Sequence, residues 1–338
     1  MTGATSTDGP PRPDPGLRAL VEGAARLLDE AGVASPRSDA TVLAAYALGV
    51  ERLELVLPPP VPAGFAERFA HLVERRRLRE PLQHITGSTG FRYLTMHVEP
   101  GVFVPRPETE QVAQVAVDEA ARLVAEGRSP VVVDLCCGAG GIAVAVATEV
   151  PTAHVAAVDA SPAAVALTRR NADAHGAPEL RVELGDVRDA ALLADLAGRV
   201  DVLVSNPPYI PPDAVPVDPE VRDHDPDLAL YGGGVDGLEI PRAVLAAAAR
   251  LLVPGGLLVM EHAEVQDAAA RRDAEATGAF VQVGTKPDLT GRPRMLVARR
   301  AHPAAPPAAP PAAHRTTHPG APGTSGGSPT DTVGGSQA

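Results

Sequence analysis

An apolar run at residues 202–204 ends abruptly in the sequence Asn206-Pro207-Pro208-Tyr209. The run lacks polar alternation, which is typical of a strand that is buried on both faces. The two prolines cannot extend its ladder because neither carries a backbone N–H. We therefore expect Asn206 at the carboxyl end of a strand, which is where open α/β sheets bind their ligands.

The chemistry available at this strand end is the recognition of an NH₂ group. The Asn206 side chain offers one acceptor and two donors, and the carbonyl of Pro207 is held in direction by its own ring and by Pro208. These two acceptors form a rigid pair, and Tyr209 adds an aromatic face beside them. The same residues would also suit a strand-ending turn with a packed tyrosine, so the rest of the chain must decide between the two interpretations.

A second candidate site is the glycine-rich loop at residues 134–141, which reads Asp-Leu-Cys-Cys-Gly-Ala-Gly-Gly. Glycines at such a place let the backbone approach a ligand closely. Asp159 ends the next predicted strand, about 20 residues further on, the offset at which an acidic residue meets ribose hydroxyls. Asp159 would also suit a helix N-cap shared with Ser161, and a nicotinamide-binding fold would show the same loop and acid.

Two features favour a nucleoside without a pyrophosphate over a dinucleotide. The glycine spacing differs from Gly-x-Gly-x-x-Gly, and the loop itself contains no Lys or Arg to hold phosphate. Gly185-Asp186 follows the third predicted strand. Together with the glycine loop and Asp159, it would complete the cofactor site. S-adenosylmethionine is a nucleoside of this kind, and we expect it as the cofactor.

These residues require a doubly wound α/β sheet to bring them together. From residue 131 the chain alternates strand and helix, the rhythm of a mostly parallel sheet with helices on both faces. The predicted strands are 131–135, 154–159, 180–183, 201–205, 256–260, 280–283 and 295–298.

The segments outside this sheet have patterns of their own. Residues 17–79 have apolar positions at helical spacing and predict a small helical bundle. Residues 80–107 predict a β-hairpin linker, because polar and apolar side chains alternate over 91–98. A helix is expected from Glu108 to about Glu126 at the start of a domain covering 108–300. The composition of 1–16 and 301–338 predicts disordered termini.

Composition excludes several classes of protein. A net charge of −12 and a pI of about 5.3 are unsuited to wrapping phosphate backbones non-specifically. The two cysteines, Cys136 and Cys137, are adjacent, so neither a disulfide framework nor zinc-ligand spacing is present. No apolar run approaches the ~20 residues that span a membrane. We expect a cytoplasmic protein without a metal site.

The motifs in combination resemble the HemK/PrmC family of protein-(glutamine-N5) methyltransferases, which methylate the Gly-Gly-Gln glutamine of peptide-chain release factors. The resemblance covers roughly residues 17–300. Asn-Pro-Pro-Tyr is shared with adenine and other amino methyltransferases, whereas Pro-Arg-Pro-Glu-Thr-Glu at 105–110 is more selective for this family. The other segments that carry the resemblance are the N-terminal bundle, Glu-Pro-Leu-Gln-His-Ile-Thr-Gly at 80–87, the glycine loop, and Asp-Leu-Thr-Gly-Arg at 288–292.

The resemblance implies a Rossmann-like class I methyltransferase sheet of seven strands, the last antiparallel, and a bundle that recognises the substrate. It implies S-adenosylmethionine as cofactor and release factors as partners, with no direct nucleic-acid contact, no membrane contact and a monomeric protein. The residues implied to bind the cofactor are Cys136, Cys137, Gly138, Ala139, Gly140, Asp159, Asp186, Val187 and Asn206. Those implied to hold the glutamine are Asn206, Pro207, Pro208, Tyr209, Arg106 and Glu108, with Asn206, Pro207 and Tyr209 as the catalytic set.

One position departs from the family pattern. Cys136 replaces the first glycine of the usual Gly-Thr-Gly-Ser-Gly loop, and a side chain there disfavours positive φ. Related paralogues whose substrates are not established carry Cys-Cys-Gly loops, so the departure bears on the substrate more than on the chemistry. Three alternatives therefore stay open at this stage: a nucleic-acid amino methyltransferase, a related protein methyltransferase with a different substrate, and a binding module with a decayed active site. An arginine in a salt bridge at the helix start is an equally good interpretation of Arg106.

Overall fold

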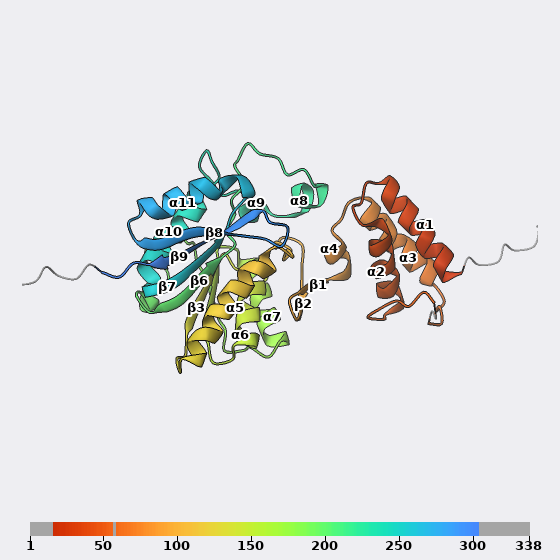
Figure 1. Cartoon of the computed structure of the whole chain (residues 1–338). Helices are drawn as coiled ribbons and strands as arrows, with labels where there is room; N and C mark the ends of the chain where they lie inside the picture. Colours follow the sequence, from red (N-terminus) through yellow and green to blue (C-terminus); the bar gives the residue numbers. More distant parts are fainter. Residues whose placement is uncertain (1–15, 57–58, 304–338) are drawn as a thin grey trace, which may run out of the picture. The chain divides into compact units, whose positions relative to one another are not determined.

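A computed structural model describes residues 16–56 and 59–303 of the 338-residue chain (Figure 1). The predictions of disorder for 1–16 and 301–338 fall almost wholly outside the described residues. No helix in the part of the chain that is described is both long and apolar enough to cross a membrane.

Three helices form the first part of the described chain. They are α1 (Leu17–Glu30), α2 (Pro36–Leu48) and α3 (Phe65–Arg77), followed by the short α4 (Leu82–Thr86). A proline at the first helical position starts α2, and Gly49 in the left-handed conformation ends it. The three helices pack around their own apolar core, which includes Leu28, Leu43 and the stacked rings of Phe65 and Phe69.

A β-hairpin follows, formed by β1 (Ser88–Phe91) and β2 (Leu94–His97). The chain reverses at Arg92 and Tyr93, inside the alternating run, so Phe91 and Leu94 face each other and both are buried. Arg92 adopts a φ of +54° in this turn, and its guanidinium holds Glu149 at 2.6 Å. The hairpin is thereby fixed to the helix that carries Glu149.

A seven-stranded sheet forms the centre of the remaining chain, with the strand order β5-β4-β3-β6-β7-β9-β8. Neighbours from β5 to β7 are parallel, and β9, the last strand in sequence, is antiparallel to both β7 and β8. This arrangement confirms the predicted fold class. The strands are β3 (Val131–Leu135), β4 (His154–Asp159), β5 (Arg181–Leu184), β6 (Val200–Ser205), β7 (Leu252–Glu261), β8 (Phe280–Pro287) and β9 (Pro293–Arg300).

Four strands are longer than the sequence predicts: β6 by one residue, and β7, β8 and β9 by more. The reason is clearest in β7. It begins at Leu252 rather than at residue 256, and it contains Pro254 and two glycines that read as a turn. The pairing with β6 shifts between Val200 and Val202, so that a bulge absorbs these residues without ending the strand. The predicted bounds of β8 and β9 were likewise short at their polar ends.

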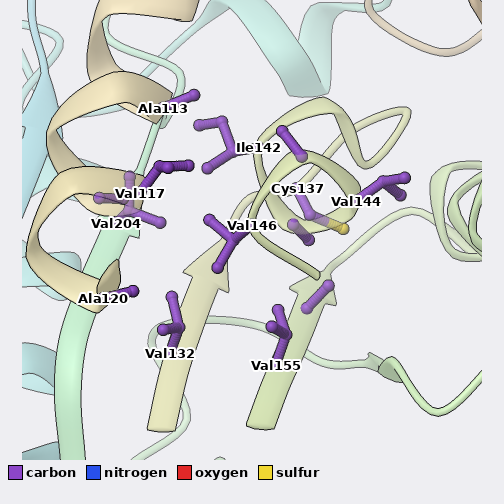
Figure 2. Close-up of a cluster of buried hydrophobic side chains, with 14 of the residues drawn as sticks. Ala113, Val117, Ala120, Val132, Cys137, Ile142, Val144, Val146, Val155 and Val204 are labelled. Atoms are coloured by element: carbon purple, nitrogen blue, oxygen red, sulfur yellow. The ribbon is translucent and has the colours of Figure 1, made fainter. Parts of the chain in front are cut away.

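Helices cover both faces of the sheet. One face carries α5 (Thr109–Ala125), α6 (Gly141–Glu149) and α7 (Pro162–Ala174), and the other carries α10 (Glu239–Leu251) and α11 (Asp267–Ala276). Figure 2 shows Val117 and Ala120 of α5 beside Val132 and Val204 of the strands. The shorter elements are α8 (Pro219–His224), α9 (Asp227–Leu230), η1 (Ala194–Leu196) and η2 (Glu264–Gln266).

Strand β6 is the most enclosed strand because every one of its six residues is buried. Val202 and Val204 pack into the core under α5 and α6, whereas Leu203 packs into the core under α10. A strand covered on both faces is mostly apolar, which explains the unbroken run Val202 to Val204. The buried polar residues Asp201 and Ser205 are hydrogen-bonded, to the Val131 N–H and to the Leu135 carbonyl.

We predict that Leu203→Ala destabilises the fold by about 2–5 kcal/mol, because it removes a fully buried side chain from a packed core. Val217→Ala is the matched control, since Val217 is 91% exposed and its truncation should change stability by less than about 0.5 kcal/mol. Denaturant titration of both variants measures the difference. Equal unfolding midpoints would contradict the conclusion that β6 is packed in the core on both faces.

Candidate active site

A cavity of about 570 Å³ lies at the carboxyl ends of the parallel strands. Leu135, Asp159, Asn206 and Glu261 line it from the ends of β3, β4, β6 and β7. Almost all of the predicted site residues also line it: Cys136, Cys137, Gly138, Ala139, Asp159, Asp186, Val187, Asn206, Pro207, Pro208, Tyr209, Arg106 and Glu108. The topology thus brings together two motifs that are about 70 residues apart.

Gly140 is the predicted site residue that is not among the lining residues of this cavity. It is the N-cap of α6 with a φ of +85°, and a Cβ at this position would lie 2.7 Å from the side chain of Thr168. Its glycine identity is therefore explained by the close approach of α7 to the loop.

The Asp159 carboxylate fixes the glycine loop by hydrogen bonding. One carboxylate oxygen accepts from the Gly138 N–H at 2.8 Å, and the other accepts from the Ser161 N–H at 2.8 Å. Ser161 itself caps α7 by accepting from Ala164 N–H. Each carboxylate oxygen has a second lone pair, so Asp159 can fix the loop and still accept hydrogen bonds from a ligand. Burial raises the pKa of Asp159.

Cys136 adopts a φ of +61°, in the left-handed region that favours glycine. A side chain in this conformation costs about 1–2 kcal/mol, so Cys136 strains the loop. Burial raises the pKa of both Cys136 and Cys137, which favours the thiol over the more nucleophilic thiolate at neutral pH. Within the described residues both cysteines are free, and no cluster of His, Cys, Asp and Glu suits a metal.

Asp186 and Val187 line the cavity beyond Asp159. The Asp186 carboxylate is engaged by Arg188, whose side chain approaches to 2.6 Å and whose backbone N–H donates at 2.8 Å. These hydrogen bonds lower the pKa of Asp186. A negative charge therefore persists at this end of the cavity, but it is already paired.

The Asn-Pro-Pro-Tyr segment leaves the sheet at Ser205, whose hydroxyl donates to the Leu135 carbonyl at 2.7 Å. Asn206 Nδ2 donates to Thr109 Oγ1 at 3.1 Å, and within the described chain its Oδ1 accepts no hydrogen bond. Because Asn206 lines the cavity, its amide oxygen is available to a ligand. The two prolines and Tyr209 continue along the same wall.

Main-chain contacts hold the rest of this segment in place. The Tyr209 carbonyl accepts from Gln266 Nε2 at 2.8 Å, and Ile210 pairs with Tyr231 in a short bridge. Two glycines make this packing possible. A Cβ on Gly232 would lie 1.9 Å from the Gly237 carbonyl oxygen, and a Cβ on Gly237 would lie 2.3 Å from the Tyr209 carbonyl oxygen. The backbone passes too closely here for any side chain.

Arg106 lies across the cavity and forms an ion pair with Asp225 at 2.5 Å. Its guanidinium also stacks over the Phe103 ring, 4.8 Å from the centroid. Burial raises the pKa of Asp225 even though Arg106 opposes the shift. Arg106 therefore ties the segment before α5 to the loop between α8 and α9, which is a longer-range contact than the salt bridge at the helix start considered above.

Sequence reasoning missed Glu261 and Thr109. Glu261 ends β7, is 3% exposed, and accepts from Thr109 Oγ1 at 2.8 Å. Burial raises the pKa of Glu261 to about 7. The signal that could have found it is an acidic residue directly after the apolar run 257–260, which is the same rule that located Asn206.

The sheet order, the glycine loop at the end of β3 and the Asn-Pro-Pro-Tyr segment at the end of β6 define a class I methyltransferase. Two family profiles match the chain: "PrmC N-terminal domain" over residues 19–87 and "Methyltransferase small domain" over residues 94–217. The chain belongs to the release factor glutamine methyltransferase family, as its similarity to curated relatives shows.

The relatives match along nearly their whole length. A release factor glutamine methyltransferase of Streptomyces coelicolor is 47% identical over 85% of this chain and 99% of its own. One of Mycolicibacterium smegmatis is 46% identical over 84% of this chain and 98% of its own. A 4-amino-L-phenylalanine/4-methylamino-L-phenylalanine methyltransferase of Streptomyces pristinaespiralis is 42% identical over 86% of this chain and 98% of its own. The resemblance inferred from the motifs is thereby confirmed.

We predict that Gly237→Ala impairs methyl transfer far more than Gly176→Ala. Both glycines have positive φ, +74° and +71°, so both substitutions carry the same conformational cost. Of the two positions, only at 237 does the new methyl group collide with the backbone, whereas no described residue has an atom within 4 Å of a Cβ at 176. Turnover is measured beside the melting temperature of each variant. Equal turnover in the two variants would show that the close packing on Tyr209 is not needed for activity.

Proposed function

We propose that this chain transfers a methyl group from S-adenosylmethionine to the side-chain amide nitrogen of a glutamine in peptide-chain release factors. The observation that carries the proposal is the arrangement at Asn206, a residue of the cavity wall whose nitrogen donates to Thr109 and whose oxygen accepts no hydrogen bond among the described residues. A primary amide is recognised by acceptors placed in this way. The names of the relatives that match over their whole length support the same substrate.

The residues of the cavity fit this cofactor. Its volume, about 570 Å³, lies within the usual range for small-molecule sites. Asp134 Oδ1 is buried without a hydrogen-bond partner among the described residues, and burial raises the pKa of this carboxyl to about 8. Arg106 and Arg188 line the cavity but are paired with Asp225 and Asp186. A cationic ligand with hydrogen-bond donors suits such a site better than an anionic pyrophosphate does.

The bound cofactor supplies an electrophilic methyl group on a sulfonium. The chain contributes orientation: Asn206 Oδ1 and the Pro207 carbonyl each accept one N–H of the glutamine amide, which aims the nitrogen at the methyl group. An amide nitrogen is a weak nucleophile, so a fixed approach and the exclusion of water must provide most of the acceleration. The ring of Tyr209 gives the aliphatic part of the glutamine an apolar surface.

On this proposal the helices within residues 17–79 recognise the protein substrate. Every residue assigned to the chemistry lies downstream of them. The matched "PrmC N-terminal domain" profile covers this region, which supports a role that is tied to the family rather than to the methyltransferase fold in general.

A second candidate substrate is a small aromatic amine, which the relative from Streptomyces pristinaespiralis favours by its name. A nucleic-acid amino group is disfavoured by the net charge of −12. The deciding experiment incubates the purified chain with isotope-labelled S-adenosylmethionine and, in parallel, a release factor, 4-amino-L-phenylalanine and RNA. Mass mapping should place the label on the glutamine of the release factor's Gly-Gly-Gln sequence. Label on either of the other two acceptors, with none on the release factor, would overturn the proposal.

We predict that Asn206→Ala lowers turnover by a factor on the order of 10²–10³, since it removes one preorganised acceptor for the amide. Asn206→Asp is the sharper variant, because it keeps the size and an acceptor oxygen but adds a negative charge. That charge stabilises the bound sulfonium more than a transition state in which the positive charge is being lost. Cofactor affinity should therefore be equal or higher while turnover falls. Wild-type turnover in Asn206→Asp would mean that the amide does not orient the acceptor.

A further inference from the structure

The Thr109 hydroxyl lies between Asn206 and Glu261 in a chain of two hydrogen bonds. Thr109 Oγ1 donates to Glu261 Oε2 at 2.8 Å and accepts from Asn206 Nδ2 at 3.1 Å. The three side chains come from the start of α5, the end of β6 and the end of β7. All three residues line the cavity, and Thr109 and Glu261 are 5% and 3% exposed.

The donor and acceptor roles in these two hydrogen bonds follow from the number of hydrogens that the groups carry. A threonine hydroxyl has one hydrogen, and an ionised carboxylate can only accept. When Glu261 is ionised, it takes that hydrogen, and Thr109 can offer Asn206 only a lone pair. Asn206 must then present its nitrogen to Thr109 and its oxygen to the cavity. When Glu261 is protonated, it can donate to Thr109, whose own hydrogen then favours the Asn206 oxygen and turns the amide over.

We propose that Thr109 and Glu261 are positioning residues, which keep the oxygen of the Asn206 amide facing the acceptor nitrogen only while Glu261 is ionised. This inference rests on the proposed function, because the oxygen is useful only toward an N–H donor. Neither residue is expected to touch the reacting atoms.

The surroundings of Glu261 place its ionisation in the range of physiological pH. The titratable and charged groups that face it are Tyr209 after β6, Arg294 on β9 and Glu108 before α5. Burial raises the pKa of Glu261 to about 7, Glu108 adds to the rise, and Thr109, Arg294 and Tyr209 oppose it. Turnover should therefore rise as the pH increases through about 7.

The stability of the fold should change in the opposite direction. A carboxyl whose pKa is higher in the folded state than in the unfolded chain binds its proton more tightly when folded. Its contribution to stability therefore favours the fold at low pH and is lost as the pH rises from the unfolded value of 4.5 through about 7. Protonation of Glu261 on mild acidification therefore stabilises the fold, so unfolding caused by this group would not explain a loss of turnover.

The first test compares Thr109→Val with Thr109→Ser and with Thr148→Val. Like Thr109, Thr148 is a helix residue. Its hydroxyl donates to the Val144 carbonyl, and it is not among the residues that line the cavity. Thr109→Val should lower kcat by about 10–100-fold with little change in cofactor Kd, because the amide is misoriented rather than absent. Thr109→Ser should restore kcat, and Thr148→Val should leave it unchanged. Wild-type kcat in Thr109→Val would overturn the proposal.

The second test uses Glu261→Gln, which cannot ionise. Its kcat should lose the rise near pH 7 that the wild type shows. A rise that persists in this variant would assign the pH dependence to another group and overturn the proposal. Melting temperatures at both ends of the pH range show whether each variant is folded.

The third test does not depend on the substrate. Carboxyl-carbon NMR of the wild-type protein should show Glu261 titrating near pH 7, and the Asn206 side-chain amide resonances should move with it. In Thr109→Val the Asn206 resonances should no longer follow the titration. If they never follow it in the wild type, the proposed coupling is absent. The protein could fail to methylate release factors while its Asn206 resonances still follow the titration of Glu261. That result would contradict the proposed function and support the positioning role of Thr109 and Glu261.

Discussion

The ladder of β6 stops at Ser205 because the two prolines that follow have no N–H to continue it, and the site depends on this stop. The chain must leave the sheet at the edge where β3, β4 and β7 also end. Asn206 is therefore fixed by the sheet on one side and by the prolines on the other. Gly232 and Gly237 then let the returning chain pack on the exit segment at distances that exclude any side chain.

Electrostatics sets what this cavity can hold. Asp134, Asp159 and Glu261 all have a raised pKa because burial disfavours their charge. The arginines at the rim are already paired with other carboxylates. The result is an acidic, partly desolvated site, which suits a ligand with a positive centre and donors. Such a site holds an acceptor by geometry rather than by a strong base.

The fold and the residues of the two main motifs could be predicted because they follow from local rules. The central strands β3 and β6 contain apolar runs, and the glycine loop and the Asn-Pro-Pro-Tyr segment each begin where such a run ends. Strand bounds failed where a bulge allows Pro254 and its neighbouring glycines to remain within β7. Thr109 was missed because its partners, Glu261 and Asn206, are 152 and 97 residues away in sequence, so no spacing reports the contacts. The pairing of Asp186 with Arg188 was missed because only the folded turn brings the two side chains together.

A crystal structure of the complex with S-adenosylhomocysteine and a peptide containing Gly-Gly-Gln would show directly whether Asn206 orients the acceptor amide. The glutamine nitrogen should lie within hydrogen-bonding distance of both Asn206 Oδ1 and the Pro207 carbonyl, with Asn206 Nδ2 still donating to Thr109. A glutamine bound elsewhere, or an Asn206 whose nitrogen faces the peptide while its oxygen contacts Thr109, would contradict this role of Asn206.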